Sequence, residues 1–198
     1  VSVQIPEGVT VVDDFAFYGC KSLTSIVLPS TVKTIGNDAF NLCWNLTSVD
    51  MPTTITSIGE RAFRECTKLR TITIPTGIEV IKKATFESCN AFVNIVIPSN
   101  VKTIEEDAFH ACRGLKSVVI PTSVTKIAKY VFYYCTELDT ITFEGIESET
   151  KKWYIADSES TWNSQTGTEL TDALTDPVQN VELFTHTYGR YNKYWFKK

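Results

Sequence analysis

Apolar and polar positions along the chain repeat with a period of 23 residues. Three residue types keep this step in register: Pro6, Pro29, Pro52, Pro75, Pro98 and Pro121; Phe17, Phe40, Phe63, Phe86, Phe109 and Phe132; and Cys20, Cys43, Cys66, Cys89, Cys112 and Cys135. Agreement among three residue types over six periods indicates a solenoid, in which each period forms one coil that stacks on its neighbours.

Each period contains one segment that predicts a strand and another that predicts a short helical piece. In the period that starts at Leu23, Ile26 and Leu28 lie on one side at the two-residue spacing of a strand. Pro29 ends this strand because it has no N–H to donate to a ladder. Val32 and Ile35 then point inward. The residues after Ile35 begin with acidic or amide side chains that suit the first turn of a helix, so we expect a short helical piece on the convex side.

Two inward columns of the strand segment are filled with apolar residues in every period. They are Leu23, Leu46, Leu69, Phe92, Leu115 and Leu138, and Ile26, Val49, Ile72, Ile95, Val118 and Ile141. One coil cannot bury such a face alone, whereas stacked coils can. We therefore expect an α/β solenoid with one parallel sheet along one face and strands about 4.8 Å apart.

The period reads LxxLxLPxxVxxIxxxAFxxCxxL, and this pattern resembles the BspA-like class of leucine-rich repeats from residue 1 to about residue 143. The resemblance implies a right-handed horseshoe-type solenoid. It also implies a secreted or surface protein, of a bacterium or a parasitic protist, for which adhesion to host molecules is the usual proposal. The chain lacks the asparagine ladder of commoner leucine-rich repeats. Only one of the six corresponding positions holds asparagine, which is Asn100.

We expect six repeats over 1–143 and a C-terminal cap and tail over 144–198. Residue 1 falls inside a strand pattern, which indicates that the first coils have been removed. The run from Phe143 to Trp153 looks like a terminal cap, a short helix that presents Trp153 to the last coil. Further on, the alternation over 181–184 indicates a strand, and residues 188–191 a hairpin turn.

Composition and charge exclude several classes of function. The chain has 198 residues and a net charge of −4, so it lacks the strong positive field that nucleic acid requires. No run of about 18 apolar residues is present, so we expect no membrane insertion. Residues 183–198 are basic and aromatic. Such a tail either binds nucleic acid or a membrane surface, or packs on the acidic cap as an edge strand. Packing on the cap is favoured because the tail is short.

The residues with reactive side chains do not form a recognisable catalytic motif. Zinc sites need closely spaced cysteine pairs, which a uniform step of 23 does not provide, so we favour six buried free thiols over bridged ones. His110 and His186 are interpreted as surface residues. The acids at 13–14 and 105–107 suit helix starts, with a calcium site as the less favoured alternative. We expect no enzyme, no metal and no cofactor.

The outward face of the sheet is the remaining candidate for binding. Its candidate residues are Arg70, Thr71, Thr73, Asn94, Lys116 and Ser117. Trp44 is the one aromatic in a polar column, so it should lie on the surface and either anchor a partner or lie flat over a neighbouring coil. The leading hypothesis is a non-enzymatic extracellular or cell-surface module that binds protein or glycan. The alternative is a structural spacer or surface-layer element without a specific ligand, with end-to-end self-association.

Overall fold

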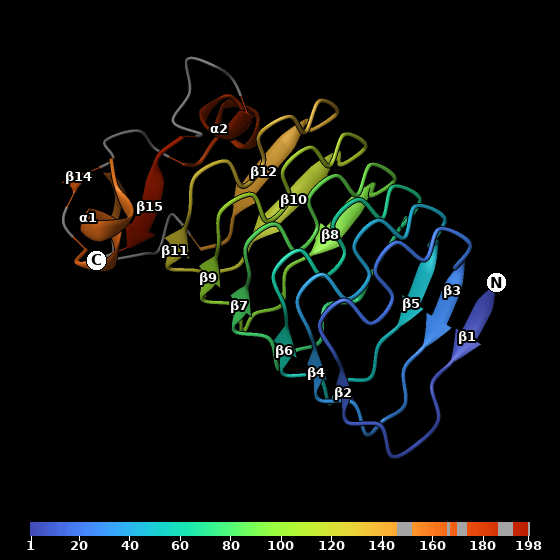
Figure 1. Ribbon diagram of the computed structural model, residues 1–198. Helices are drawn as coiled ribbons and strands as arrows, with labels where there is room; N and C mark the ends of the chain where they lie inside the picture. The colour runs from blue at the N-terminus through green and yellow to red at the C-terminus, as the bar shows by residue number, and fades with distance from the viewer. Residues whose placement is uncertain (146–151, 166, 170–173, 186–191, 198) are drawn as a thin grey trace.

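The computed structural model describes residues 1–145, 152–165, 167–169, 174–185 and 192–197. These residues form a solenoid of about six coils, closed at its C-terminal end by a small cap (Figure 1). One coil corresponds to one sequence period: coil 1 is residues 1–22, coil 2 is 23–45, coil 3 is 46–68, coil 4 is 69–91, coil 5 is 92–114 and coil 6 is 115–137. Residues 138–143 add the first strand of a further turn, which pairs with coil 6. The winding brings residues 23 positions apart side by side, as the sequence period predicts.

The first side of each coil, called the sheet face below, carries the predicted parallel strands. They are β1 (Ser2–Gln4), β3 (Ser25–Val27), β5 (Ser48–Asp50), β8 (Asn94–Val96), β10 (Ser117–Ile120) and β12 (Thr140–Phe143). The expectation of one continuous sheet is wrong. The strands form two three-stranded sheets, β1-β3-β5 and β8-β10-β12, and residues 71–73 of coil 4 between them form no strand.

The second side carries a line of two-residue strands. They are β2 (Val11–Val12), β4 (Thr34–Ile35), β6 (Ser57–Ile58), β7 (Val80–Ile81), β9 (Thr103–Ile104) and β11 (Lys126–Ile127). They also pair in parallel, with a break between β6 and β7. The second residue of each strand is apolar and buried, which agrees with the inward position expected for Ile35 and its equivalents.

The third side, called the turn face below, is formed by residues 13–20, 36–43, 59–66, 82–89, 105–112 and 128–135. The expected short helices are absent from residues 1–145, where consecutive turns stand in their place. Asp38 and Leu42 have φ of 53° and 63°, a left-handed conformation that ends a right-handed helix. Their N–H groups donate to carbonyl oxygens of coil 3. A helix would direct these N–H groups along its own axis, so cross-coil bonding replaces helical bonding. The right-handed winding stays a prediction.

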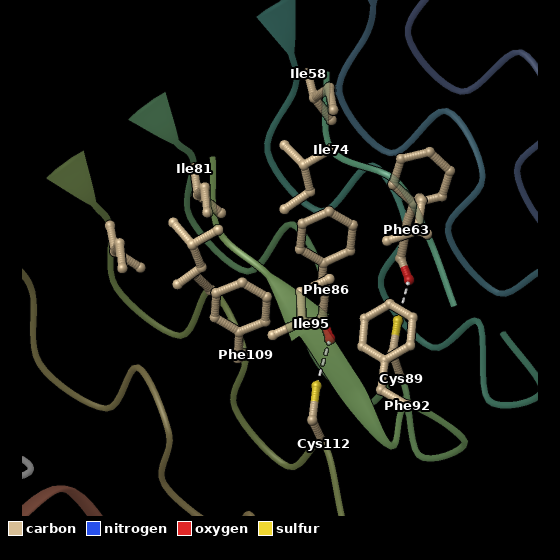
Figure 2. Close-up of a cluster of buried hydrophobic side chains, with 14 of the residues drawn as sticks. Ile58, Phe63, Ile74, Ile81, Phe86, Cys89, Phe92, Ile95, Phe109 and Cys112 are labelled. Carbon is tan, nitrogen blue, oxygen red and sulfur yellow. Dashed lines mark hydrogen bonds between the residues drawn. The ribbon is translucent and has the colours of Figure 1, made fainter. Parts of the chain in front are cut away.

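The core is built from ladders of identical side chains (Figure 2). Five stacked pairs of phenylalanines run from Phe17 to Phe132, with ring centroids 5.2–5.7 Å apart. The strand columns predicted from the sequence are buried throughout, and Phe92 of coil 5 packs against Phe86. Stability therefore comes from repeated contacts between neighbouring coils.

The cap consists of β13 (Trp153–Ala156), α1 (Glu159–Asn163), β14 (Thr168–Glu169), α2 (Pro177–Thr185) and β15 (Tyr194–Lys197). β15 lies antiparallel between β11 and β13, so it extends the second sheet and covers its last strand. Trp153 meets the last coil as expected, edge-on to Phe143, but from a strand rather than a helix.

Two other expectations for the tail have different outcomes. The segment 181–184, expected as a strand, belongs to α2, whose face bearing Val181 and Phe184 packs on the last coil. Tyr194, Trp195 and Phe196 are buried in β15, so this part of the tail packs on the cap as the favoured interpretation predicted. The hairpin expected at 188–191 and the second histidine, His186, lie outside the described residues.

Candidate binding face

The structure places the six candidate binding residues on the sheet face of coils 4 to 6. Arg70, Thr71, Thr73, Asn94 and Lys116 are exposed, and Ser117 is half-buried. Asn94 and Ser117 are register partners in β8 and β10, and the Ser117 hydroxyl donates to Asn94 Oδ1 at 3.1 Å. Thr71 and Thr73 lie in the segment that forms no strand.

Exposed valines lie beside these polar residues. Val96 is 78% exposed, and Val93 and Val119 are 46% and 44% exposed. Val96 pairs with Val119 in register, and the N–H of Lys116 donates to the carbonyl oxygen of Val93. Val93, Val96 and Val119 are not among the candidate residues named from the sequence. The three outward valines in adjacent periods were the signal for an apolar patch.

Arg70 and Lys116 form no ion pair with the part of the chain that the structure describes. On the turn face, Arg61, Arg64, Lys83 and Lys129 are paired with acids of other coils. Arg61 contacts Asp38 at 2.9 Å, and Arg64 contacts Glu87 at 2.9 Å. The cations of the sheet face therefore keep their charge available to a partner.

The acidic residues proposed as an alternative calcium site serve the stacking of coils instead. Asp14 Oδ1 accepts from the backbone N–H of Asn37, and Glu105 Oε2 accepts from that of Lys83. Burial raises the pKa of the Glu106 carboxyl, but hydrogen bonds from Lys83 and Lys129 outweigh burial and hold its pKa below the usual value. Among the described residues, no group of three or more His, Cys, Asp and Glu side chains is placed to hold a metal ion.

Trp44 lies on the surface, as its column predicted, and is 40% exposed. The Lys21 ammonium of the preceding coil sits 4.2 Å from its ring centroid, in cation–π geometry. His110, the other singled-out surface residue, is half-buried on the turn face and stacks on Tyr133. Neither residue lies in the group around Arg70 and Lys116.

All six cysteines are free, and all but Cys20 are buried. This confirms the free-thiol interpretation for five positions. Each buried thiol donates to a phenylalanine carbonyl oxygen of the preceding coil, as Cys89 does to Phe63 at 3.2 Å (Figure 2). Burial raises the pKa of Cys43 and of Cys135 to about 12. Thiols held in the protonated form are poor nucleophiles, so this ladder is structural.

The comparisons with known proteins agree with the repeat pattern. The family model described as "BspA type Leucine rich repeat region" matches in six copies, over residues 1–115 and 63–159. The chain belongs to this family. Repeats of this kind are typically non-enzymatic binding or scaffold modules. Among the described residues, no helix is both long enough and apolar enough to cross a membrane.

Solved structures show the same architecture. A leucine-rich repeat protein of T. pallidum is 36% identical, with a TM-score of 0.69, and the match covers 73% of this chain and 71% of that one. The pneumococcal vaccine antigen PcpA is 22% identical, with a TM-score of 0.63, over 73% of this chain and 40% of the antigen, and this likeness shows the fold alone. A search of curated proteins found no match.

Proposed function

We propose that this chain is a non-enzymatic repeat module of a secreted or cell-surface protein that binds an extracellular protein or glycan through its sheet face. The observation that carries the proposal is the contrast between two sides of the solenoid. Arg61, Arg64 and Lys83 on the turn face are paired with acids of other coils, whereas Arg70 and Lys116 on the sheet face form no ion pair with any described residue. Lys116 also lies beside the exposed Val93.

Membership of the BspA-type family supports the surface location, because the family pattern is typical of surface and secreted proteins. The proposed partners exclude nucleic acid and the membrane interior. The net charge of −4 disfavours nucleic acid, and the buried aromatics of β15 are not available to a second ligand.

The test is surface binding of the chain to a panel of extracellular-matrix proteins and of mammalian and bacterial glycans. A variant with Arg70→Ala, Asn94→Ala and Lys116→Glu alters the sheet face. A matched control with Lys33→Ala, Asn100→Ala and Lys102→Glu changes exposed residues away from that face. The expected result is saturable binding that is lost in the first variant and kept in the control. Absence of saturable binding across the panel would contradict the proposal.

A structural spacer is the second candidate, and the sheet face of coils 1 to 3 favours it. Small hydroxyl residues dominate there and bond to one another, as Ser25 does to Ser2 at 2.9 Å. Such a face offers few of the Trp, Tyr and Arg anchors that dominate binding energies. End-to-end self-association in sedimentation experiments, without any binding on the panel, would favour the spacer.

A further inference from the structure

A small apolar and basic surface stands out on the sheet face. We define the sheet-face patch as Arg70, Val93, Asn94, Val96, Lys116 and Val119. The register of β8 and β10 places Val96 beside Val119, and the backbone hydrogen bond from Lys116 to Val93 places these two side by side. Arg70 occupies the equivalent position one period before Val93. Val93 and Lys116 therefore lie three residues before the valine pair Val96 and Val119, with Asn94 and Ser117 between them.

The apolar part of the patch is unusual in its exposure. Val96 is 78% exposed, which is the highest value among the large exposed hydrophobic side chains of the structure's described part. Valine favours strands whichever way it points, so one exposed valine needs no explanation. Val96 and Val119 are register partners, and Val93 is exposed three residues before Val96, so together they offer apolar surface that gains free energy when a partner removes it from water.

The charges of the sheet face set the limits of the patch. Arg70 and Lys116 lie within it, and no acid belongs to it. Towards the N-terminal end, the outward column of Val96 reaches Asp50 in β5, and towards the C-terminal end, the column of Lys116 reaches Asp139. An anionic partner is therefore attracted over coils 4 to 6 and repelled beyond them. Three neighbouring coils span roughly 10 Å, which is the width of one extended chain with its side chains.

We propose that the sheet-face patch binds an acidic polypeptide segment that also carries apolar side chains. This deepens the proposed function and rests on it. A polypeptide is favoured over an anionic glycan because a glycan covers its binding site with hydroxyl groups, and Val93, Val96 and Val119 offer these groups no hydrogen-bond partner. A segment with carboxylates and apolar side chains matches both halves of the patch.

The test selects ligands from a display library of random 12-residue peptides, so that the chemistry of the partner is itself the readout. The bait is the full chain, in parallel with an Arg70→Glu and Lys116→Glu variant and a Lys33→Glu and Lys102→Glu control. Both variants change the net charge from −4 to −8. Peptides selected by the wild-type chain and by the control are expected to be enriched in Asp and Glu and in apolar residues, and the patch variant should not select them.

Affinity measurements by fluorescence polarisation then separate the two parts of the patch. The double charge reversal should weaken binding of a selected peptide about tenfold, and the matched control should leave it within about twofold. Val96→Ser should weaken the same peptide, whereas Val178→Ser, at a valine that is 62% exposed in α2, should not. All these positions are exposed, and unchanged thermal unfolding would verify that the variants fold.

Several results would overturn the inference. Selected peptides without acidic enrichment would do so, as would peptides that bind the patch variant as tightly as the wild-type chain. Patch-dependent binding of heparin together with failure to select peptides would identify a glycan site instead. Panel binding that survives the double charge reversal would overturn this inference and leave the proposed function standing, whereas an empty panel would contradict the proposed function itself.

Discussion

At the scale of single residues, the cysteine ladder makes a sharp prediction about thiol chemistry. Cys20 is exposed, and the other five cysteines are buried. A thiol-specific reagent at neutral pH should label one thiol per chain within minutes, and six after denaturation, because a buried thiol is both inaccessible and protonated. Cys20→Ala should abolish the fast labelling. Rapid labelling of a second thiol in the native chain would show that the ladder is not sealed from solvent.

The same ladder predicts how stability depends on alkaline pH. Burial raises the pKa of the Cys89 thiol well above its ordinary value of 9.0. Above about pH 9 the unfolded chain loses this proton and the folded chain keeps it, so ionisation favours unfolding and the free energy of unfolding falls as pH rises. Cys89→Ala should reduce the slope of this fall by about 1.4 kcal/mol per pH unit.

Denaturant titrations at several pH values above 9 measure the slope, independently of the overall stability that the substitution costs. Cys20→Ala, at the exposed thiol, is the matched control and should leave the slope unchanged. Equal slopes for Cys89→Ala and the wild-type chain would contradict a role for the buried thiol in the alkaline response.

At the scale of elements, the turn face depends on left-handed residues that are not glycine. The position that is Gly19 in coil 1, with φ of 66°, is Ser88 in coil 4, with φ of 61°. Its N–H donates to the carbonyl oxygen of His110 at 2.8 Å, a bond that every substituent keeps. Ser88→Gly should therefore raise the free energy of unfolding by about 1 kcal/mol, because glycine adopts positive φ without steric cost.

Two further substitutions check this interpretation by chemical denaturation. Ser88→Val should destabilise the chain by more than about 1 kcal/mol, since a β-branched side chain tolerates positive φ poorly. Ser99→Gly, at an exposed serine with negative φ, should lower stability slightly, because glycine there only adds freedom to the unfolded chain. A loss of stability in Ser88→Gly would contradict the argument.

The elements differ in how far the sequence determines them. The strands of the sheet face follow from alternation that ends at a proline, and this signal is local. The conformation of the turns does not follow from the local sequence. These residue types share no preference for positive φ, although all six positions have it: Gly19, Leu42, Glu65, Ser88, Ala111 and Tyr134. At the first five of these positions the N–H donates to a carbonyl oxygen of the next coil, a bond that one period alone does not reveal, so the pattern of one period predicts a helix instead.

The candidate binding face shows the same division. The outward columns predicted that Arg70, Asn94 and Lys116 are exposed, because strand alternation fixes which side chains face solvent. The absence of ion pairs at Arg70 and Lys116 depends on the placement of acids in neighbouring coils, which the columns alone do not give. The outward positions of Val93, Val96 and Val119 follow from the sequence, but the serine and threonine residues around them hide the apolar pattern.

At the scale of the whole molecule, the strand pairing of the described solenoid is interrupted at coil 4. Both lines of strands break at the junction of coils 3 and 4, since β6 does not pair with β7 and residues 71–73 form no strand beside β5. The turn face stays joined there, with Phe63 donating to the carbonyl oxygen of Thr85 at 2.9 Å. The phenylalanine ladder also continues through this junction, with 5.7 Å between the ring centroids of Phe63 and Phe86.

We attribute the missing strand of coil 4 to a side chain in the core. Phe92 is the one aromatic in a column that holds leucine in the other five periods, and its ring packs on Phe86 of coil 4 at 5.8 Å. Both rings are fully buried, so we expect the larger ring at position 92 to disturb the adjacent strand segment of coil 4. Coil 4 keeps its hydrogen bonds on the turn face, whereas its residues 71–73 form no strand.

Hydrogen exchange tests this account within a single molecule. Backbone amides of residues 71–74 should exchange on the order of 100-fold faster than those of β3 and β10, because they lack ladder partners. The amide of Phe63, which is bonded across the same junction on the turn face, should remain protected. Phe92→Leu, which restores the residue of the other periods, should slow exchange at 71–74.

Equal protection of all strand segments would mean that coil 4 is held as tightly as its neighbours. Unchanged exchange in Phe92→Leu would show that the ring of Phe92 does not cause the interruption. The sheet-face patch spans this segment, so a partner bound between Arg70 and Lys116 should also slow exchange there.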